Sequence, residues 1–480
     1  MKSYVYLAVS TVALASTSAA FAQSNDSTVT QSGTGGAVTV TQTAAGNTSD
    51  VDQSGNTSTT TVTQAGPDGF NGSVVDQSAD TSSITVSQEG FDLGLPAPET
   101  NTSDVTQAGV DQDVVSTQVG DANSSTVTQS GVQMEVALIQ GGAGNSSTVS
   151  QSNTDNQADI FQDGDNNSSV IVQSDEDGTI DLDQTGAGQS STITQTDDNN
   201  QNAVVTQSNA DNSSVVNQRA SNSDAFVTQT GTMNTSLLVQ GNISDNQEAT
   251  ITQSGNGNSS DVRQGVDASG PLDDDNVVFV DQQGDDNIAF VRQDNERNFA
   301  GILQTGNGNE ARVDAQGDGV SGGGNEDNSA TIEQSGNGNF ASVNQPGENN
   351  IYDVQQSGND NSSTGDQSGQ GLGGLAFVTQ IGSGNTSSVI QVGAGAGTAS
   401  NTATVSQSGD LGGSEITQNG SDNTATLTQL LGSSMADSDI TQTGSLNVAG
   451  VTQGGIMDAS SVTQNGTGNS VTVSQNPPKP

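Results

Sequence analysis

The chain has 480 residues, of which 29% are hydrophobic and 3% aromatic, and it contains no Trp, Cys or His. This composition cannot supply several thick cores, so the chain is either disordered or built on a thin core that is repeated many times. The formal charge of −48 argues against binding of nucleic acid and of anionic membranes. The missing Cys and His exclude disulfides, thiolate or imidazole catalysis and the usual zinc sites.

Residues 1–22 have the features of a secretory signal peptide. Lys2 gives a positive start, Tyr4–Ala15 is mostly apolar, and the sequence AFA at 20–22 offers a small-x-small cleavage site. The alternative is a buried N-terminal strand or helix. No later segment has the roughly 18 apolar residues of a transmembrane helix. We therefore expect a secreted chain without membrane insertion.

Glutamine recurs through the rest of the chain with a period of eleven residues. Of the 37 intervals between 38 successive positions, 27 equal eleven, and the other ten are 12 to 19 residues long. Polar low-complexity sequence does not hold such a phase by chance, so the period indicates a repeat architecture. The positions are 31, 42, 53, 64, 77, 88, 107, 118, 129, 140, 151, 162, 173, 184, 195, 207, 218, 229, 240, 253, 264, 282, 293, 304, 316, 334, 345, 356, 367, 380, 391, 407, 418, 429, 442, 453, 464 and 475.

Each period combines a short strand with a bend. In QSGNGNSSDVRQ (253–264) and QNGTGNSVTVSQ (464–475), Gly stands at +2 and +4, Asn at +5, Val at +9 and Gln at +11. Positions +5, +7, +9 and +11 alternate like one face of a strand, and the glycine-rich +1 to +4 segment fits a tight bend. A helical eleven-residue repeat is rejected, because Gly recurs and β-branched residues dominate.

One Val or Ile per unit, worth ~1.5–3 kcal/mol when buried, cannot order eleven residues, so the units must stack. In a stack, each buried Gln or Asn meets its equivalent about 4.8 Å away and hydrogen-bonds to it. Such ladders avoid the ~1–3 kcal/mol penalty of an unpaired buried amide. The predicted ladder and core residues are Gln253, Asn258, Gln264, Gln334, Asn339, Ala341, Val343, Gln345, Gln418, Asn423, Gln429, Gln464, Asn469 and Gln475.

The repeat resembles the curlin repeat of bacterial curli fibre subunits, Ser-x5-Gln-x-Gly-x-Gly-Asn-x-Ala-x3-Gln. Residues 329–345, SATIEQSGNGNFASVNQ, fit it except that Ser329 lies one position too close, and residues 418–429, QNGSDNTATLTQ, keep most of it. Partial matches run from about residue 24 to 475. The chain departs from the family by its unusual length, by its few aromatic residues and by Ser at the Ala position, as in Ser147 and Ser260.

The resemblance implies an all-β fold, a β-solenoid of stacked 22-residue coils in which two eleven-residue strand-arc units carry Gln and Asn ladders. It further implies a structural subunit that polymerises end to end into extracellular amyloid fibres of a biofilm matrix, with roles in adhesion. The partners implied are other copies of the chain, a nucleator subunit and an outer-membrane secretion channel of a Gram-negative-type bacterium. The residues themselves do not fix two strands per coil.

The breaks in the period predict loops rather than domain boundaries. Residues 23–475 are expected to form one repeat domain, with insertions near 89–101, 265–276, 317–328 and 392–401. The tail 476–480, NPPKP, cannot continue a sheet.

Acidic clusters such as Asp273–Asp275 and Asp285–Asp286 are expected to be solvated charge that slows aggregation. No metal site, cofactor or catalytic residue is predicted, although weak binding of divalent cations between stacked carboxylates stays open. A glycosidase is disfavoured, because aromatic platforms and basic partners are scarce.

Two other functions remain alternatives to the fibre subunit. One is a monomeric, surface-displayed solenoid adhesin. The other is an ice-binding solenoid, which needs Thr-x-Thr pairs on consecutive rungs of one face. The pairs are scattered in sequence, at Thr126–Thr128, Thr192–Thr194, Thr250–Thr252 and Thr426–Thr428.

Overall fold

The structure, a computed structural model, describes residues 11–16, 25–43, 45–66, 70–90, 100–196, 199–241, 245–266, 275–294, 297–316, 327–368, 373–393 and 400–475. These residues form 39 strands and no helix. They fall into two compact units, Met1–Thr230 and Gly231–Pro480. Each unit is a β-solenoid, which confirms the predicted fold class.

The strands take up most of both units, and one of them spans the boundary between the units. The first unit contains β1 (Thr11–Ser16), β2 (Asp26–Gln31), β3 (Ala37–Gln42), β4 (Thr48–Gln53), β5 (Thr59–Ala65), β6 (Gly72–Gln77), β7 (Ser83–Glu89), β8 (Thr102–Val110), β9 (Asp113–Asp121), β10 (Ser124–Val132), β11 (Glu135–Ala143), β12 (Ser146–Thr154), β13 (Gln157–Asp165), β14 (Ser168–Gln173), β15 (Thr179–Ala187), β16 (Ser190–Gln195), β17 (Asn202–Ala210) and β18 (Ser213–Gln218). The boundary strand is β19 (Asp224–Thr232). The second unit contains β20 (Thr235–Gln240), β21 (Glu248–Asn256), β22 (Ser259–Gln264), β23 (Val277–Gln283), β24 (Ile288–Asp294), β25 (Phe299–Thr305), β26 (Glu310–Gln316), β27 (Ser329–Ser335), β28 (Phe340–Asn344), β29 (Ile351–Asn359), β30 (Ser362–Ser368), β31 (Leu375–Ser383), β32 (Thr386–Gly393), β33 (Thr402–Gln407), β34 (Gly413–Ser421), β35 (Thr424–Gln429), β36 (Asp437–Ser445), β37 (Val448–Gln453), β38 (Ala459–Thr467) and β39 (Ser470–Gln475).

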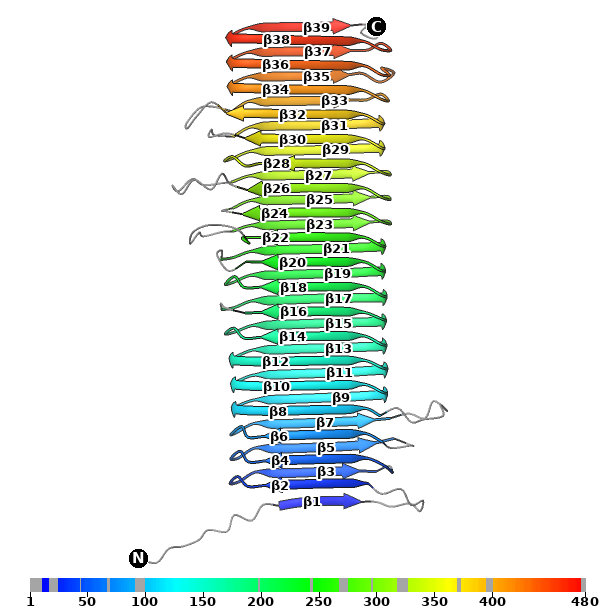
Figure 1. The fold of residues 1–480 in the computed structure, drawn as a ribbon, viewed down its shortest axis with the longest axis vertical. Coiled ribbons are helices and arrows are strands. Elements are labelled where there is room, and N and C mark those ends of the chain that lie inside the picture. The colour runs from blue at the N-terminus through cyan, green and yellow to red at the C-terminus, as the bar shows by residue number, and fades with distance from the viewer. Residues whose placement is uncertain are drawn as a thin grey trace, which may run out of the picture. The chain divides into compact units, whose positions relative to one another are not determined.

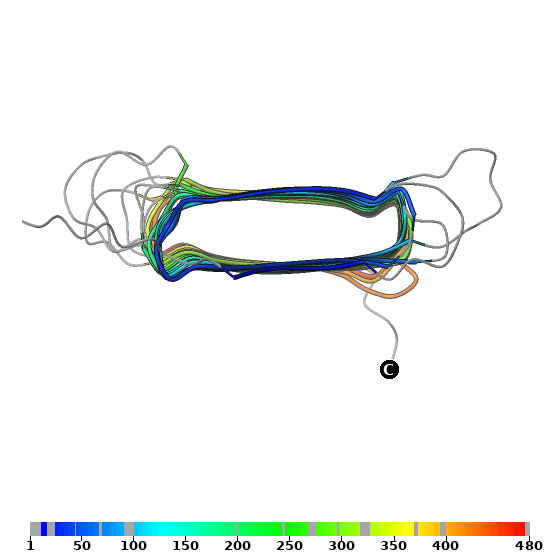
Figure 2. The ribbon, with the colours of Figure 1, turned by 90° about the horizontal axis from the view of Figure 1, so that it is seen from below.

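Two strands make one coil, so the question that the sequence left open is settled. In each unit the odd-numbered strands form one parallel sheet, the odd sheet, and the even-numbered strands form the other, the even sheet (Figure 1). Seen end-on, the two sheets are the long sides of a flattened ring and the arcs are its short sides (Figure 2). Strands pair in register with equivalents one coil away, as Gln129 does with Gln151 in β10 and β12.

The interior is one side chain thick from each sheet. Along β4 the burial alternates, so that Ser49, Val51 and Gln53 point inward and Thr48, Asp50 and Asp52 point outward. The predicted six-residue strand is observed here, and other strands run on into the arc, as β10 does to Val132. They can do so because the arcs also pair from one coil to the next, for example Gly131 with Asn153.

Glycine in the arc is required by the close approach of neighbouring coils. Gly336 has φ +107°, and a Cβ atom there would collide with the carbonyl oxygen of Gly358 in the next arc. An L side chain at +2 therefore meets both an unfavourable backbone conformation and a steric clash. The glycine-rich bend that the sequence predicts has this physical basis.

Several sequence predictions fall on residues outside the described ranges. The four predicted insertions lie largely in undescribed segments, and the tail 476–480 lies wholly in one. Of residues 1–22, the structure describes Thr11–Ser16, which form β1 and pair with β3. The signal peptide and the single repeat domain of residues 23–475 therefore stay predictions.

One arc replaces the usual buried Asn by a carboxyl group. Gly178 stands at the +5 position between β14 and β15, and its backbone N–H donates to Asn156 Oδ1 at 2.9 Å. Asp175, at the usual glycine position, is only 2% exposed, and its carboxyl occupies the space that a side chain at 178 would need. Burial, followed by the charge of Asp177, raises the pKa of Asp175 to about 7.

The stability of the first unit should therefore fall as the pH rises between about 4 and 7. The folded state holds the Asp175 proton to a higher pH than the unfolded state does, so its stabilisation is complete at low pH and is lost toward pH 7. Asp175→Asn should raise the free energy of unfolding at pH 8 by roughly 1–3 kcal/mol and change it little at pH 4, as measured by urea denaturation.

Asp155→Asn is the matched control, since Asp155 is exposed in the preceding arc on the same side of the coil. It should leave the pH dependence of stability unchanged. An Asp175→Asn effect of equal size at both pH values would contradict the assignment.

Candidate assembly site: the amide ladders

The buried glutamines of each sheet form hydrogen-bonded ladders along the stack. Gln334 Nε2 donates to Gln356 Oε1 at 2.9 Å, and Gln304 donates to Gln334 in the same way. The second N–H of Gln334 donates to the backbone carbonyl of Glu310, on the opposite sheet, at 3.0 Å. Each amide therefore connects successive coils and also ties the two sheets together.

The other glutamines predicted from the sequence have equivalent partners. Gln253, Gln264, Gln345, Gln418 and Gln429 each donate to the glutamine of the next coil at 2.8 to 3.2 Å. Gln464 and Gln475 accept from Gln442 and Gln453.

The asparagines form ladders with the opposite polarity. Asn339 donates its backbone N–H and its Nδ2 to Asn309 Oδ1, one coil toward the N-terminus, at 3.0 and 3.1 Å. Asn258, Asn423 and Asn469 likewise donate to the preceding coil. Glutamine-to-glutamine donors thus point toward the C-terminal end of the stack, and asparagine-to-asparagine donors toward its N-terminal end. Asn339 Nδ2 also donates to the carbonyl of Gly358, in the following arc, at 2.9 Å.

Ala341 and Val343 lie in the thin core between the sheets, at 0% and 1% exposure. In the first unit, the position of Ala341 in the even sheet is held by serines. Ser103 and Ser125 pair through their hydroxyls at 3.0 Å, whereas the buried Oγ atoms of Ser49 and Ser73 have no partner. Serine is therefore tolerated at the Ala position, at the cost of some unsatisfied hydroxyls.

One rung lacks its amide, and this corrects the sequence assignment of Gln316 to the ladder. Gln293 pairs in register with Ala315, and Gln316 with Asp294. The Oε1 atom of Gln345, in the next coil, is consequently buried without a hydrogen-bond partner. The interval of twelve residues before Gln316, followed by one of 18, was the available signal of the shift.

Ala315→Gln should fill this gap and stabilise the second unit. The new amide can donate to Gln345 Oε1 and accept from Gln293, and the hydrogen bonds outweigh the entropy lost by the side chain by about 1 kcal/mol. The expected result is a higher urea midpoint with an unchanged slope.

Ala311→Gln is the control, because Ala311 is buried on the same strand but in the apolar column. It should destabilise the unit by overpacking. An Ala315→Gln variant no more stable than the parent would contradict the ladder argument.

Carboxylates stack on the outer faces and repel one another. Burial raises the pKa of Asp159, and the charge of Asp181 on the neighbouring strand adds to the shift. The pKa of Asp183 is raised by burial, then by Asp181 and Asp163. Within the described ranges, no three acidic side chains converge into a group that could hold a metal ion, and weak binding of divalent cations stays a prediction.

The four Thr-x-Thr pairs lie on β10, β16, β21 and β35, and no two of these strands are neighbours in a sheet. Consecutive rungs do carry threonine on β3 and β5, with Thr39 and Thr41 beside Thr61 and Thr63, a short run that the sequence pairs did not reveal. Among the described residues, there is no helix of the length and hydropathy required to cross a bilayer.

Two segments that contain ladder residues match a known protein family. Residues 326–358 and 398–430 match the family model of the curlin associated repeat. Both segments lie in the second unit and include the ladder residues Gln334, Asn339 and Gln418. A comparison with curated proteins found no match. The repeat that the sequence resembles is thus present in these two segments of the chain.

Proposed function

We propose that this protein is a structural subunit of extracellular, curli-like amyloid fibres, which it forms by end-to-end stacking of solenoids and without enzymatic activity. The observation that carries the proposal is that the ladders end with unused hydrogen-bonding groups. At the N-terminal end, the Oε1 atom of Gln31 is buried without a partner. Such a group is costly unless another coil covers it.

The two ends of the stack are complementary to each other. Gln475 Nε2 donates to the carbonyl of Ala459, and the amide has one further N–H that can point to a following coil. The glutamine ladder therefore ends on a donor at the C-terminus and on an acceptor at the N-terminus, and the asparagine ladder does the reverse. Head-to-tail contact continues both ladders, whereas head-to-head contact would oppose two acceptors.

The first and last strands of the repeat also match for head-to-tail contact. The last strands, β38 and β39, and the first repeat strands, β2 and β3, have glutamine at equivalent positions. In the precursor, β1 pairs with β3, with Ser16 in register with Gln42. Removal of residues 1–22 as a signal peptide would leave β3 as the edge strand for a second copy.

The proposed location of the fibres is outside the cell. Proposed partners are a nucleator subunit that offers a first edge and an outer-membrane channel of a Gram-negative-type bacterium, both taken from the family resemblance. The formal charge of −48 keeps the separate chain soluble before assembly.

Purified chain 23–480 should form thioflavin-positive fibres with a meridional reflection at about 4.8 Å. Because the stacked carboxylates repel, growth should be faster at pH 4 than at pH 8, and faster when salt is added. Equal rates across this pH range would contradict the role given to charge. Monomers that persist at high concentration and mildly acidic pH would contradict the fibre proposal.

Gln475→Glu should slow fibre elongation about tenfold or more at pH 7. The carboxylate still accepts from Gln453, so the last coil keeps its ladder bond, but it cannot donate to the next copy. A loss of about 1.4 kcal/mol per junction corresponds to this factor.

Thr472→Glu is the control, since it adds the same charge on the outward side of the same strand. Seeded growth followed by thioflavin fluorescence separates the two variants. If both slow growth equally, the ladder amide is not what joins the copies.

A further inference from the structure

Three successive arcs of the second unit have an unusual residue in a left-handed backbone conformation. Many arcs of the described chain end with such a residue, commonly Gly, Asn or Asp, as at Asn166 and Asp211. These types adopt the left-handed conformation at little cost. The three unusual arcs have Leu411, Met435 and Met457 there instead, with φ of 58°, 54° and 57°.

The three residues form one column along a short side of the second unit. Leu411 lies in the arc between β33 and β34, Met435 between β35 and β36, and Met457 between β37 and β38 (Figure 1). Each backbone N–H donates to the preceding coil at 2.8 to 3.1 Å, so the residues are one coil apart. Leu431 and Ile456 belong to the same arcs, and all five side chains are 49% to 86% exposed. We call these five residues the apolar ridge.

The ridge combines two unfavourable features in one place. Leu and Met strain a left-handed backbone, and their exposed side chains gain no burial in return. Strain of this kind, repeated in successive coils, points to a functional contact. Leu446, on the opposite arc, shows the same features alone, with φ 56° and 57% exposure. Its neighbours along that column are Asp422 and Gly468, so no ridge forms there.

The area of the ridge fits a second copy of itself. The five side chains together expose about 600 Å², the size of the largest apolar patch on a typical monomer. Two such ridges in contact bury about 1,200 Å² in total, the area at which specific protein interfaces begin. A row of apolar side chains at equal steps of about 4.8 Å also matches itself about a two-fold axis, as a symmetric dimer requires.

The distribution of charge allows two copies to approach at this place. Residues 371–480 contain 6 of the 55 acidic residues, so repulsion between copies is weakest in this part of the chain. The carboxylates that flank the ridge are engaged by backbone N–H groups. Asp410 accepts from Ser383 at 2.9 Å, and Asp458 accepts from Gly455 at 2.7 Å.

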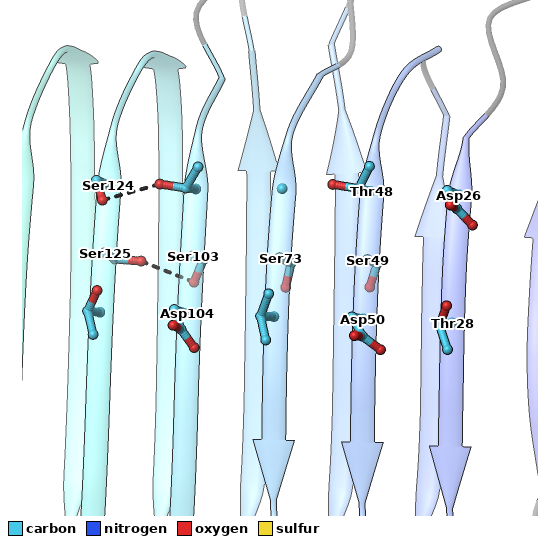
Figure 3. Close-up of a pocket in the computed structure, with 14 residues that line it drawn as sticks. Asp26, Thr28, Thr48, Ser49, Asp50, Ser73, Ser103, Asp104, Ser124 and Ser125 are labelled. Carbon is cyan, nitrogen blue, oxygen red and sulfur yellow. Dashed lines mark hydrogen bonds between the residues drawn. The ribbon is translucent and has the colours of Figure 1, made fainter.

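The outer face of the first unit offers the opposite kind of surface. A groove of about 540 Å³ crosses β2 to β10, and Asp26, Asp50 and Asp104 line it together with Ser and Thr hydroxyls (Figure 3). Val74, 51% exposed, lies among these polar side chains. A ridge that docked in this groove would cover carboxylates without pairing them, which is costly.

We infer that two copies of this chain associate side by side through the apolar ridge, ridge against ridge. Met435, at the middle of the row, then lies opposite Met435 of the second copy, and the exposed Leu, Ile and Met side chains leave water. The contact uses a side of the stack, whereas end-to-end assembly uses the first and last coils. Each contact can therefore form without the other, and each can be tested alone.

Leu411→Asn/Met435→Asn/Met457→Asn separates docking from any role in folding. Asn suits the left-handed backbone and leaves the net charge unchanged, so the urea midpoint should stay the same or rise. The dissociation constant of the side-by-side dimer should nevertheless rise tenfold or more, as measured by sedimentation equilibrium at pH 8. Leu446→Asn is the matched control and should leave the dimer unchanged.

The outcomes distinguish the ridge from other contacts. A dimer formed end to end would be weakened by Gln475→Glu and not by the triple Asn variant. A triple Asn variant that dimerises as tightly as the parent, or an equal loss in Leu446→Asn, would overturn the inference. A parent chain that stays monomeric and binds phosphatidylcholine vesicles through the ridge would overturn it as well.

Disulfide trapping gives an independent readout, because the chain contains no Cys. Met435→Cys chains should cross-link to one another on mild oxidation, since a two-fold axis brings the central residues of the two ridges together. Val74→Cys is the control, because Val74 is apolar and as exposed as Met435, at 51% against 49%. Equal cross-linking of the two variants would refute the ridge contact.

Discussion

The buried primary amide governs this structure. An amide inside a protein needs partners for two donors and one carbonyl, and a thin core of Val and Ala offers none. Gln334 finds them only because another glutamine lies one coil above and another one coil below, with a carbonyl across the coil. The requirement is met when the same residue type recurs at a fixed spacing, so it imposes both the period and the parallel register. A slip by one residue would bury outward-facing Thr or Asp, and every amide of the column would lose its hydrogen-bond partners.

Much of this follows from the sequence because the constraint is written into every period. The phase of the glutamines, the Asn at +5 and the alternation to Val at +9 predicted the strand, the inward face and the bend. The number of strands per coil was not readable, since each half-repeat looks alike and closure depends on arc geometry. Gln316 was assigned to the ladder because it is a glutamine, but the alternation of inward-facing positions along the strand decides which residue joins the ladder. In β26 the inward positions are Ala311, Val313 and Ala315.

The features that sequence reasoning missed are relations between distant positions. Asp175 and Gly178 exchange the residue types usual at +2 and +5, a local signal that becomes meaningful once the carboxyl is seen inside the arc. Arg263 and Arg292 are 29 residues apart, because the glutamine interval between their strands is lengthened, and Arg292 and Arg312 are 20 apart, because Arg312 stands opposite Phe290. The sequence therefore does not reveal that the three share a face. Columns of charged residues can be recognised only once the register is known. The columns of core residues, in contrast, determine the register.

The separation between ladder partners has a kinetic meaning. Bonded glutamines are 22 residues apart in regular coils and up to 30 where an arc carries an insertion, as between Gln77 and Gln107. Among the ladder bonds of the described residues given above, none joins more distant segments. Loop closure therefore costs nearly the same entropy for every such coil, and this cost grows only slowly with arc length. Once one coil exists, each next coil is wound onto a finished template. Winding time should then scale with the number of coils, not with the search that a 480-residue globular chain would face, and a chain delivered gradually from one end can complete its structure as it arrives.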